Sequence, residues 1–184
     1  GKGINVSTVL QNLGIANTAF GFTAGFVGEE VRKEVEQLGV KAEFISLDEG
    51  VSRINLKLKS IDGTEINGRG PKIPREAVDA LMTQLDRLGA DDTLVLAGSI
   101  PASMPDDIYQ KIMERLDGRD VRIVVDATKD LLLNVLGHHP FLIKPNNHEL
   151  GDIFGVKLSE REEVVPYAKK LQEKGAVNVL VSMA

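Results

Sequence analysis

The sequence predicts an α/β fold built on a mostly parallel sheet, with a small antiparallel β lid, and three observations support this. From about Pro74 onward, helical segments alternate with short apolar runs rich in β-branched residues, which is typical of parallel strands joined by crossover helices. Residues 41–70 instead alternate polar and apolar positions with a period of two, which indicates strands with one solvated face. The chain also opens with a lysine between two glycines, directly before an amphipathic segment.

The opening segment predicts a helix whose apolar face carries Val6, Val9, Leu10 and Leu13. Free backbone N–H groups, the positive end of the helix dipole and Lys2 would suit a bound phosphate or a polar sugar there. An exposed lysine beside a helix start is equally ordinary, and the glycine spacing matches neither a Walker loop nor a dinucleotide fingerprint. The segment therefore indicates a site only in combination with other residues.

An antiparallel β lid is predicted within residues 41–70. Segments 43–46 and 53–59 alternate polar and apolar residues, and Asp62-Gly63 is a strong hairpin signal with residues 64–66 returning. Such a lid would project from the α/β body, and its exposed edge would suit a partner subunit. Arg53 on this lid faces either solvent or ligand, depending on the register of the strands.

The second half of the chain predicts four strands of the main sheet with helices between them. Proline near the first turn and a following glycine mark the first of these helices, from Pro74 to Gly89. The strands are expected at residues 93–97, 121–126, 141–144 and 178–182, and the helices at residues 74–88, 105–116, 131–136 and 164–175.

Two clusters of polar residues follow these strands, at the carboxyl edge where open α/β sheets bind ligands. Gly98-Ser99-Ile100-Pro101 is a small turn that could present N–H groups and a hydroxyl to a phosphate or sugar. Lys144 ends a strand, and Asn146 with Glu149 could be either a helix capping box or a Mg²⁺ site acting through water. Asp126 could face a ligand, although a cap for the helix after it is the more ordinary role.

The composition of the chain limits the kinds of molecule that it can bind. The 184 residues carry a net charge of -5 and an isoelectric point near 5.3, so there is no basic field for nucleic acid or an anionic membrane. No apolar run is long enough to span a bilayer. The chain has no cysteine, which fits a reducing cytoplasm. A small anionic substrate would therefore have to be held by a few local positive groups.

Taken in order, these motifs resemble the ribokinase-like, or PfkB, family of sugar and nucleoside kinases. The resemblance extends over nearly the whole chain. It rests on Gly1–Ser7, the turn Gly25–Gly28, Arg53–Lys57, Thr64–Gly68, Gly98–Pro101 and Lys144–Asn146. It implies a three-layer α/β/α body with a small β lid that often helps to form homodimers. It also implies ATP-dependent phosphorylation of fructose 1-phosphate, with tagatose 6-phosphate as the nearest alternative substrate.

The resemblance also implies roles for individual residues. On the sugar-phosphate side, Lys2 and Arg53 would hold the phosphate already on the substrate, while the remaining positions would contact sugar hydroxyls or line the pocket: Gly1, Gly3, Asn5 and Ser99. On the ATP side, Lys144, Asn146 and Glu149 would arrange Mg²⁺ and the nucleotide phosphates, with Mg²⁺ held by Asn146 and Glu149 through water. Ser182 matches a nucleotide-side position on the last strand.

The family's catalytic base, the aspartate of a Gly-Ala-Gly-Asp motif, has no counterpart in this sequence, so no catalytic residue is assigned. We therefore expect residues 1–184 to be the central part of a kinase domain, without its first strand and its carboxyl-terminal nucleotide-binding part. Alone, they would be an inactive sugar-phosphate-binding module. An NAD-linked oxidoreductase is the other alternative, but it requires a glycine fingerprint that the sequence lacks.

Overall fold

A computed structural model describes residues 1–58 and 64–183. The chain divides into two compact units, residues 1–84 and residues 85–184, and each is described by itself. Within the described ranges, no helix combines the length and the apolar character needed to cross a membrane. The predicted α/β class, with a mostly parallel sheet and a small antiparallel one, is confirmed.

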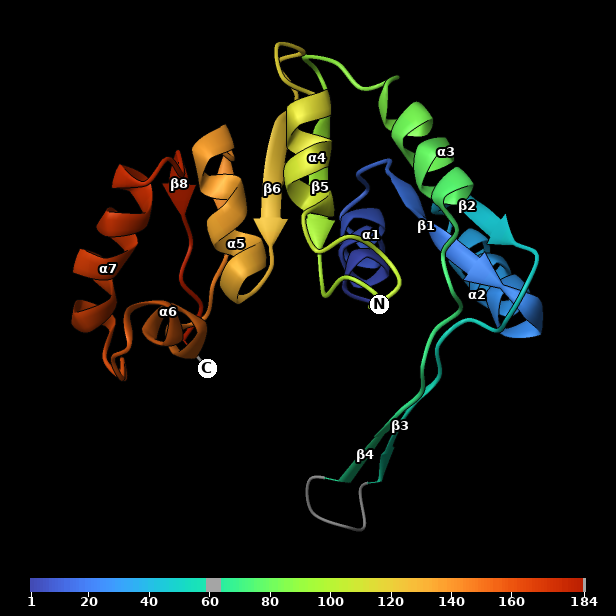
Figure 1. The fold of residues 1–184 in the computed structure, drawn as a ribbon, viewed down its shortest axis with the longest axis horizontal. Helices are drawn as coiled ribbons and strands as arrows, with labels where there is room; N and C mark the ends of the chain where they lie inside the picture. The colour runs from blue at the N-terminus through green and yellow to red at the C-terminus, as the bar shows by residue number, and fades with distance from the viewer. Residues whose placement is uncertain (59–63, 184) are drawn as a thin grey trace. The chain divides into compact units, whose positions relative to one another are not determined.

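The first unit is built around two parallel strands. Its elements are α1 (Lys2–Asn12), β1 (Thr18–Ala24), α2 (Gly25–Gln37), β2 (Lys41–Leu47), β3 (Asn55–Leu58), β4 (Thr64–Asn67) and α3 (Arg75–Leu85). Figure 1 shows β1 and β2 side by side, with α2 against them. Their core consists of Ala19, Val35, Val40 and Phe44, and Ile4 of α1 packs against it.

The pairing of β2 corrects one prediction. This strand runs parallel to β1, in register from Thr18 opposite Lys41 to Ala24 opposite Leu47, so residues 43–46 are not part of an antiparallel lid. The period-two pattern identified a strand with one buried face, where Phe44 lies, but such a pattern does not define the direction of the neighbouring strand. The turn expected at Gly25–Gly28 is also wrong, because these residues form the first turn of α2.

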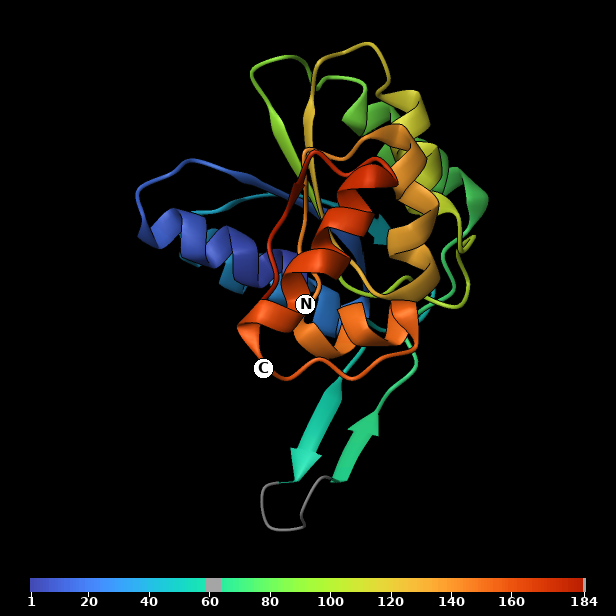
Figure 2. The ribbon, with the colours of Figure 1, turned by 90° about the vertical axis from the view of Figure 1, so that its left-hand side faces the viewer.

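The hairpin predicted from residues 53–59 and 64–66 is confirmed in the residues that the structure describes, although its first strand begins at Asn55 and leaves Arg53 outside. Strands β3 and β4 pair antiparallel, from Asn55 opposite Asn67 to Leu58 opposite Thr64. Figure 2 shows their arrows pointing in opposite directions. The predicted turn at Asp62-Gly63 lies outside the described residues.

The second unit holds a four-stranded parallel sheet with the strand order β5-β6-β7-β8. Its elements are β5 (Thr93–Ala97), α4 (Ile108–Arg115), β6 (Arg122–Asp126), α5 (Lys129–Val135), η1 (Leu136–His138), β7 (Leu142–Ile143), α6 (Asn147–Phe154), α7 (Arg161–Glu173) and β8 (Asn178–Val179). All four predicted strands are present, although β7 and β8 are shorter than expected. The side chains that fill its core are almost inaccessible to solvent: Val125, Leu132, Val135, Ile143, Leu150 and Leu171.

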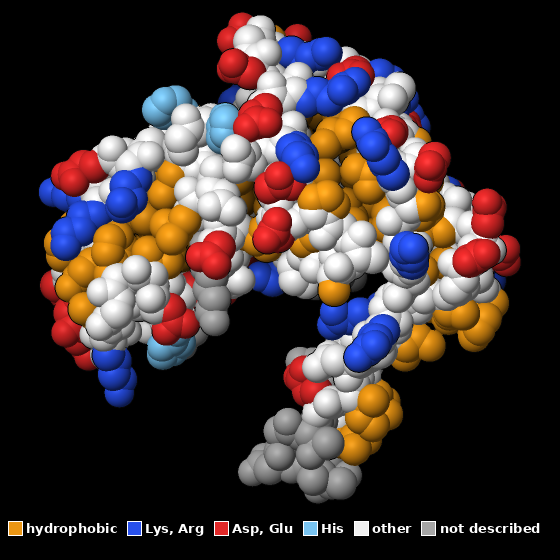
Figure 3. Space-filling model, viewed as in Figure 1, with side chains coloured by type: hydrophobic (Ala, Val, Ile, Leu, Met, Phe, Trp, Pro, Cys, Tyr) orange, Lys and Arg blue, Asp and Glu red, His pale blue; other side chains and the backbone are white. Residues whose placement is uncertain are grey.

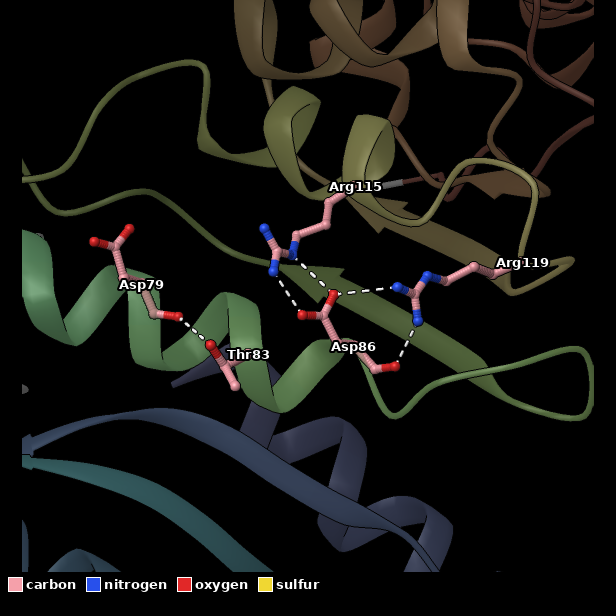
Figure 4. Close-up of polar contacts among 5 residues, drawn as sticks. All are labelled: Asp79, Thr83, Asp86, Arg115 and Arg119. Carbon is pink, nitrogen blue, oxygen red and sulfur yellow. Dashed lines mark hydrogen bonds and ion pairs between the residues drawn. The ribbon is translucent and has the colours of Figure 1, made fainter.

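Asp86 and two arginines form a cluster at the start of this unit (Figure 4). Arg115 donates two hydrogen bonds to the Asp86 carboxylate, one of them from Nε over 2.8 Å. Arg119 donates to the backbone carbonyl of Asp86 and also reaches the carboxylate over 3.4 Å. The cluster thus joins the segment after α3 to the end of α4 and to the turn before β6. The hydrogen bond from Arg115, more than any other contact, holds the pKa of Asp86 below its ordinary value of 3.8.

A depressed carboxyl pKa makes a testable contribution to stability. Because the folded protein favours the ionised form, Asp86 stabilises it above the ordinary carboxyl pKa, and this contribution is lost as the pH falls through the lower, folded value. We expect Asp86→Asn to lower the melting temperature at pH 7, and the difference from wild type to shrink as the pH is lowered below 3.8. Thermal unfolding followed by circular dichroism over this range measures it.

Asp79→Asn provides the matched control, because the carboxylate of Asp79 is mostly exposed and meets Arg75 only at 3.9 Å. At pH 7 its effect should be smaller. An Asp86→Asn difference that stayed constant down to pH 2, or that equalled the Asp79→Asn difference at pH 7, would contradict this role of Asp86.

Candidate functional site

The carboxyl ends of β5, β6 and β7 bring several of the predicted site residues to one edge of the sheet. Because the strands are parallel, with Ala97 opposite Asp126 and Val125 opposite Ile143, the segments that follow them leave at the same edge. The amide of Gly98 donates to the carbonyl of Asp126 over 3.0 Å, and the amide of Lys144 donates to that of Val125, also over 3.0 Å. The turn with Ser99 and the lysine that follows β7, Lys144, therefore both lie next to the end of β6.

Lys144 and Asp126 form an ion pair at this edge. The ammonium nitrogen lies 3.4 Å from Oδ1 of Asp126, and 36% of the lysine side chain but only 16% of the aspartate side chain is exposed. The prediction of Asp126 as a helix cap is wrong, because α5 has Thr128 at its N-cap and no capping side chain. Asp126 instead holds the ammonium group of Lys144 at the carboxyl edge of the sheet, where an anionic ligand would contact it.

Asn146 and Glu149 form the capping box that their spacing predicts. The carboxylate of Glu149 accepts from the amide of Asn146, and the side chain of Asn146 accepts from the amide of Glu149, both over 2.8 Å. Ser182 lies beside them, since it forms a parallel bridge with Asn146 and its amide donates to the carbonyl of Pro145 over 3.1 Å. The four residues expected on the ATP side are therefore neighbours at the carboxyl end of β7.

The oxygen ligands of this group suit a hard cation such as Mg²⁺. Within residues 1–58 and 64–183, no cluster of three or more His, Asp or Glu side chains could by itself hold a metal ion. A Mg²⁺ ion near Asn146 and Glu149 would therefore take further ligands from water and from the phosphates of a bound nucleotide. The residues fit this arrangement, and their role as ligands stays a prediction.

The turn after β5 is held by a residue that the sequence analysis did not identify. Tyr109, in the first turn of α4, donates its hydroxyl to the carbonyl of Gly98 over 3.2 Å. Gly98 has a φ of 99°, a conformation that favours glycine, and the exposed Ser99 follows it. No spacing rule connects a helix residue to a turn eleven positions earlier, so the sequence contained no signal for this contact.

The other predicted substrate residues belong to the first unit. Gly1 is the N-cap of α1 and receives no side-chain cap, and Lys2, Gly3 and Asn5 are exposed in its first turn. The helix start therefore has the form that was expected.

Arg53 directly precedes the hairpin and is exposed. Its guanidinium donates to Oδ1 of Asn55 over 2.6 Å and to Oδ1 of Asn67 over 3.4 Å. Because Asn55 and Asn67 are cross-strand partners, Arg53 lies along the polar face of the hairpin. Whether this exposed guanidinium meets a ligand stays a prediction.

Comparisons with known proteins agree with these features. The sequence family described as pfkB family carbohydrate kinase matches residues 1–184. A 1-phosphofructokinase of Bacillus subtilis is 46% identical over 184 residues, covering all of this chain and 60% of that protein. A D-tagatose-1-phosphate kinase of Bacillus licheniformis is 36% identical, with 99% of this chain and 60% of that protein covered. The chain thus spans about 60% of the length of these curated relatives.

Solved structures show the same fold. A Staphylococcus aureus crystal structure described as that of a phosphofructokinase superposes with a TM-score of 0.87 at 39% identity, covering the whole of this chain and 60% of that one. Phosphofructokinase-2 of Escherichia coli, solved with fructose-6-phosphate, superposes with a TM-score of 0.86 at 21% identity, covering all of this chain and 62% of that one. The second likeness concerns the fold alone.

Proposed function

Because this chain belongs to the pfkB family of carbohydrate kinases, we propose that it is part of a kinase that transfers a phosphoryl group from ATP to fructose 1-phosphate, giving fructose 1,6-bisphosphate. The intact protein is the natural chain that contains residues 1–184, together with any sequence that precedes or follows them. We also place this protein in the cytoplasm, where ATP and sugar phosphates are found; the lack of cysteine is consistent with this.

The observation that carries the proposal is the group at the carboxyl end of β7. Phosphoryl transfer requires above all that the reacting groups are positioned and that the developing charge is neutralised. Lys144 presents an ammonium group that Asp126 holds in place, and such a group suits nucleotide phosphates. Asn146 and Glu149 would hold Mg²⁺ through water, and the ion would neutralise charge on those phosphates. Ser182 lies beside Asn146, with which it forms a parallel bridge.

The sugar phosphate is assigned to a second set of residues. Lys2 and Arg53 are exposed cations that would bind the phosphate already on the sugar, in a chain with no general attraction for anions. Gly1, Gly3 and Asn5, at the start of α1, would contact the sugar hydroxyls, and Ser99, in the turn after β5, would also bind the substrate. Support for fructose 1-phosphate comes from the relatives named 1-phosphofructokinase.

A competing proposal within the same class is a tagatose phosphate as the substrate. Tagatose 6-phosphate follows from the sequence resemblance, and tagatose 1-phosphate is suggested by the relative that is 36% identical. A coupled ADP-release assay of the intact protein with these two sugars, fructose 1-phosphate and fructose 6-phosphate discriminates between them. We expect the highest kcat/KM with fructose 1-phosphate. A clear preference for a tagatose phosphate would change the substrate, and no turnover of any of the four would contradict the proposal.

Residues 1–184 alone are proposed to bind without turnover, because the Gly-Ala-Gly-Asp motif that supplies the family's base is absent from them. Isothermal titration calorimetry with fructose 1-phosphate, beside the ADP-release assay, tests this on the isolated chain. Binding without ADP release is the expected result. Turnover by the isolated chain would show that a residue within it can serve as the base.

The hairpin is proposed to join two copies of the protein in a homodimer. Ile54, Leu56 and Ile66 are 58%, 51% and 57% exposed, and Leu56 and Ile66 are direct cross-strand partners, so one face of the hairpin is apolar. Figure 3 shows hydrophobic side chains on one side of the hairpin. A two-stranded hairpin gains stability by covering such a face, and a second copy could cover it.

We expect Leu56→Lys to convert a dimer of the intact protein to a monomer, because a charge on this face would be buried in the interface. Light scattering coupled to size-exclusion chromatography measures the mass. Val165→Lys on α7, where the original side chain is 50% exposed, is the matched control and should leave the mass unchanged. A wild-type monomer, or a Leu56→Lys dimer, would rule out this interface.

A further inference from the structure

We propose that Tyr109 is a positioning residue for the sugar-phosphate side of the site: its hydroxyl holds the turn at Gly98 and thereby sets the place of Ser99. The hydroxyl donates to the carbonyl of Gly98 over 3.2 Å, although Tyr109 lies on α4 and Gly98 follows β5. This inference rests on the proposed function, which places Ser99 in the substrate pocket.

The turn is fixed on two sides. Gly98 donates its amide to the carbonyl of Asp126 over 3.0 Å and accepts at its own carbonyl from Tyr109, so both backbone polar groups of this residue have partners. Its φ of 99° is a conformation that glycine alone adopts without strain. Without the tyrosine hydroxyl, the carbonyl of Gly98 would lose its partner, and the peptide plane that leads into Ser99 could rotate.

The surroundings of Tyr109 keep its hydroxyl a donor. Burial, and to a smaller extent the negative charge of Asp126, raise the pKa of Tyr109 to about 12. The phenol therefore stays protonated even at a pH where an ordinary tyrosine, with a pKa of 10.0, is half ionised.

The nucleotide side has separate supports. Lys144 is held by its ion pair with Asp126 and by its amide bond to the carbonyl of Val125. Asn146 and Glu149 hold each other in the capping box. None of these contacts involves the hydroxyl of Tyr109, so its loss should affect the sugar phosphate and leave ATP binding unchanged.

The test is Tyr109→Phe in the intact protein, which removes one oxygen atom and keeps the ring. Tyr167→Phe is the matched control, because Tyr167 is the only other tyrosine in the sequence and its ring, on α7, packs against Phe154 of α6. Loss of one neutral hydrogen bond predicts a rise of about 3- to 10-fold in KM for the sugar phosphate. KM for ATP should stay unchanged, and the control should change neither value.

A second measurement does not depend on activity. Amide hydrogen exchange in residues 98–100 should become faster in Tyr109→Phe and not in Tyr167→Phe, because the turn is less firmly held. Unchanged exchange would overturn the inference, as would faster exchange with an unchanged KM for the sugar phosphate. A purely structural role would lower the melting temperature without changing either KM, and that too would overturn it. If exchange is faster but the intact protein turns over no sugar phosphate, the hydroxyl of Tyr109 does hold the turn and the proposed function is contradicted.

Discussion

Replacing Lys144 by methionine in the intact protein is expected to lower kcat/KM for ATP strongly. Its ammonium is the positive group at the carboxyl end of β7, and a hydrogen bond from a charged group contributes about 1.5–3 kcal/mol, which corresponds to about 10- to 150-fold. Methionine keeps the length and the apolar stem of lysine. Steady-state kinetics with ATP as the varied substrate, at saturating fructose 1-phosphate, measure the change.

Two further variants separate the charge from the fold. Lys144→Arg keeps the ion pair with Asp126 and should recover part of the lost kcat/KM, whereas Lys157→Met removes an exposed lysine in the loop after α6 and should have no effect. Lys144→Met leaves the mostly buried carboxylate of Asp126 without this partner, so thermal unfolding should accompany the assay. A folded Lys144→Met protein with wild-type kcat/KM for ATP would contradict the assignment of this residue to the nucleotide.

Gly175→Ala is expected to cause the largest loss of stability. The φ of Gly175 is 129°, a backbone conformation that residues with a side chain rarely adopt. A Cβ atom at this position would also overlap the backbone carbonyl of Leu136. Backbone strain and overpacking each contribute about 1–3 kcal/mol, so the free energy of unfolding should fall by roughly 2–6 kcal/mol. The carbonyl of Gly175 also lies 3.1 Å from Nδ1 of His139, so a shift of this loop would disturb the segment before β7.

Gly137→Ala is the matched control, because it lies in the adjacent η1 segment, has no positive φ, and would meet no other atom within 4 Å of its Cβ. It should change the free energy of unfolding by less than about 0.5 kcal/mol. Urea denaturation of both variants gives the comparison. Equal stabilities of the two variants would show that the loop between α7 and β8 adopts another backbone conformation.

The sequence predicted the second unit better than the first. Strands 93–97 and 121–126 are flanked by clear helix signals, and a buried parallel strand has an apolar pattern that needs no knowledge of its partner. In the first unit, residues 18–24 contain Gly21 and two threonines and follow no simple alternation, so β1 and its parallel pairing with β2 were not predicted. Pairing depends on contacts between distant segments, and local periodicity does not contain them.

In the candidate site, too, local features could be predicted from the sequence and contacts between distant segments could not. The capping box of Asn146 and Glu149 has a fixed spacing of three and could be predicted in full. The ion pair of Asp126 with Lys144, and the hydrogen bond of Tyr109 to Gly98, join elements that only the folded sheet brings together. Asp126 was consequently assigned to the next helix, and Tyr109 was not singled out at all.

The intact protein is proposed to add a second phosphate to fructose 1-phosphate, with ATP as the phosphoryl donor. Phosphorus NMR of the reaction mixture tests it directly, because it observes the product rather than the release of ADP. We expect the phosphate on carbon 1 to remain, a new phosphomonoester signal to appear from carbon 6, and ADP to form in equal amount. ADP formed together with inorganic phosphate, or ATP left unchanged beside fructose 1-phosphate, would contradict it.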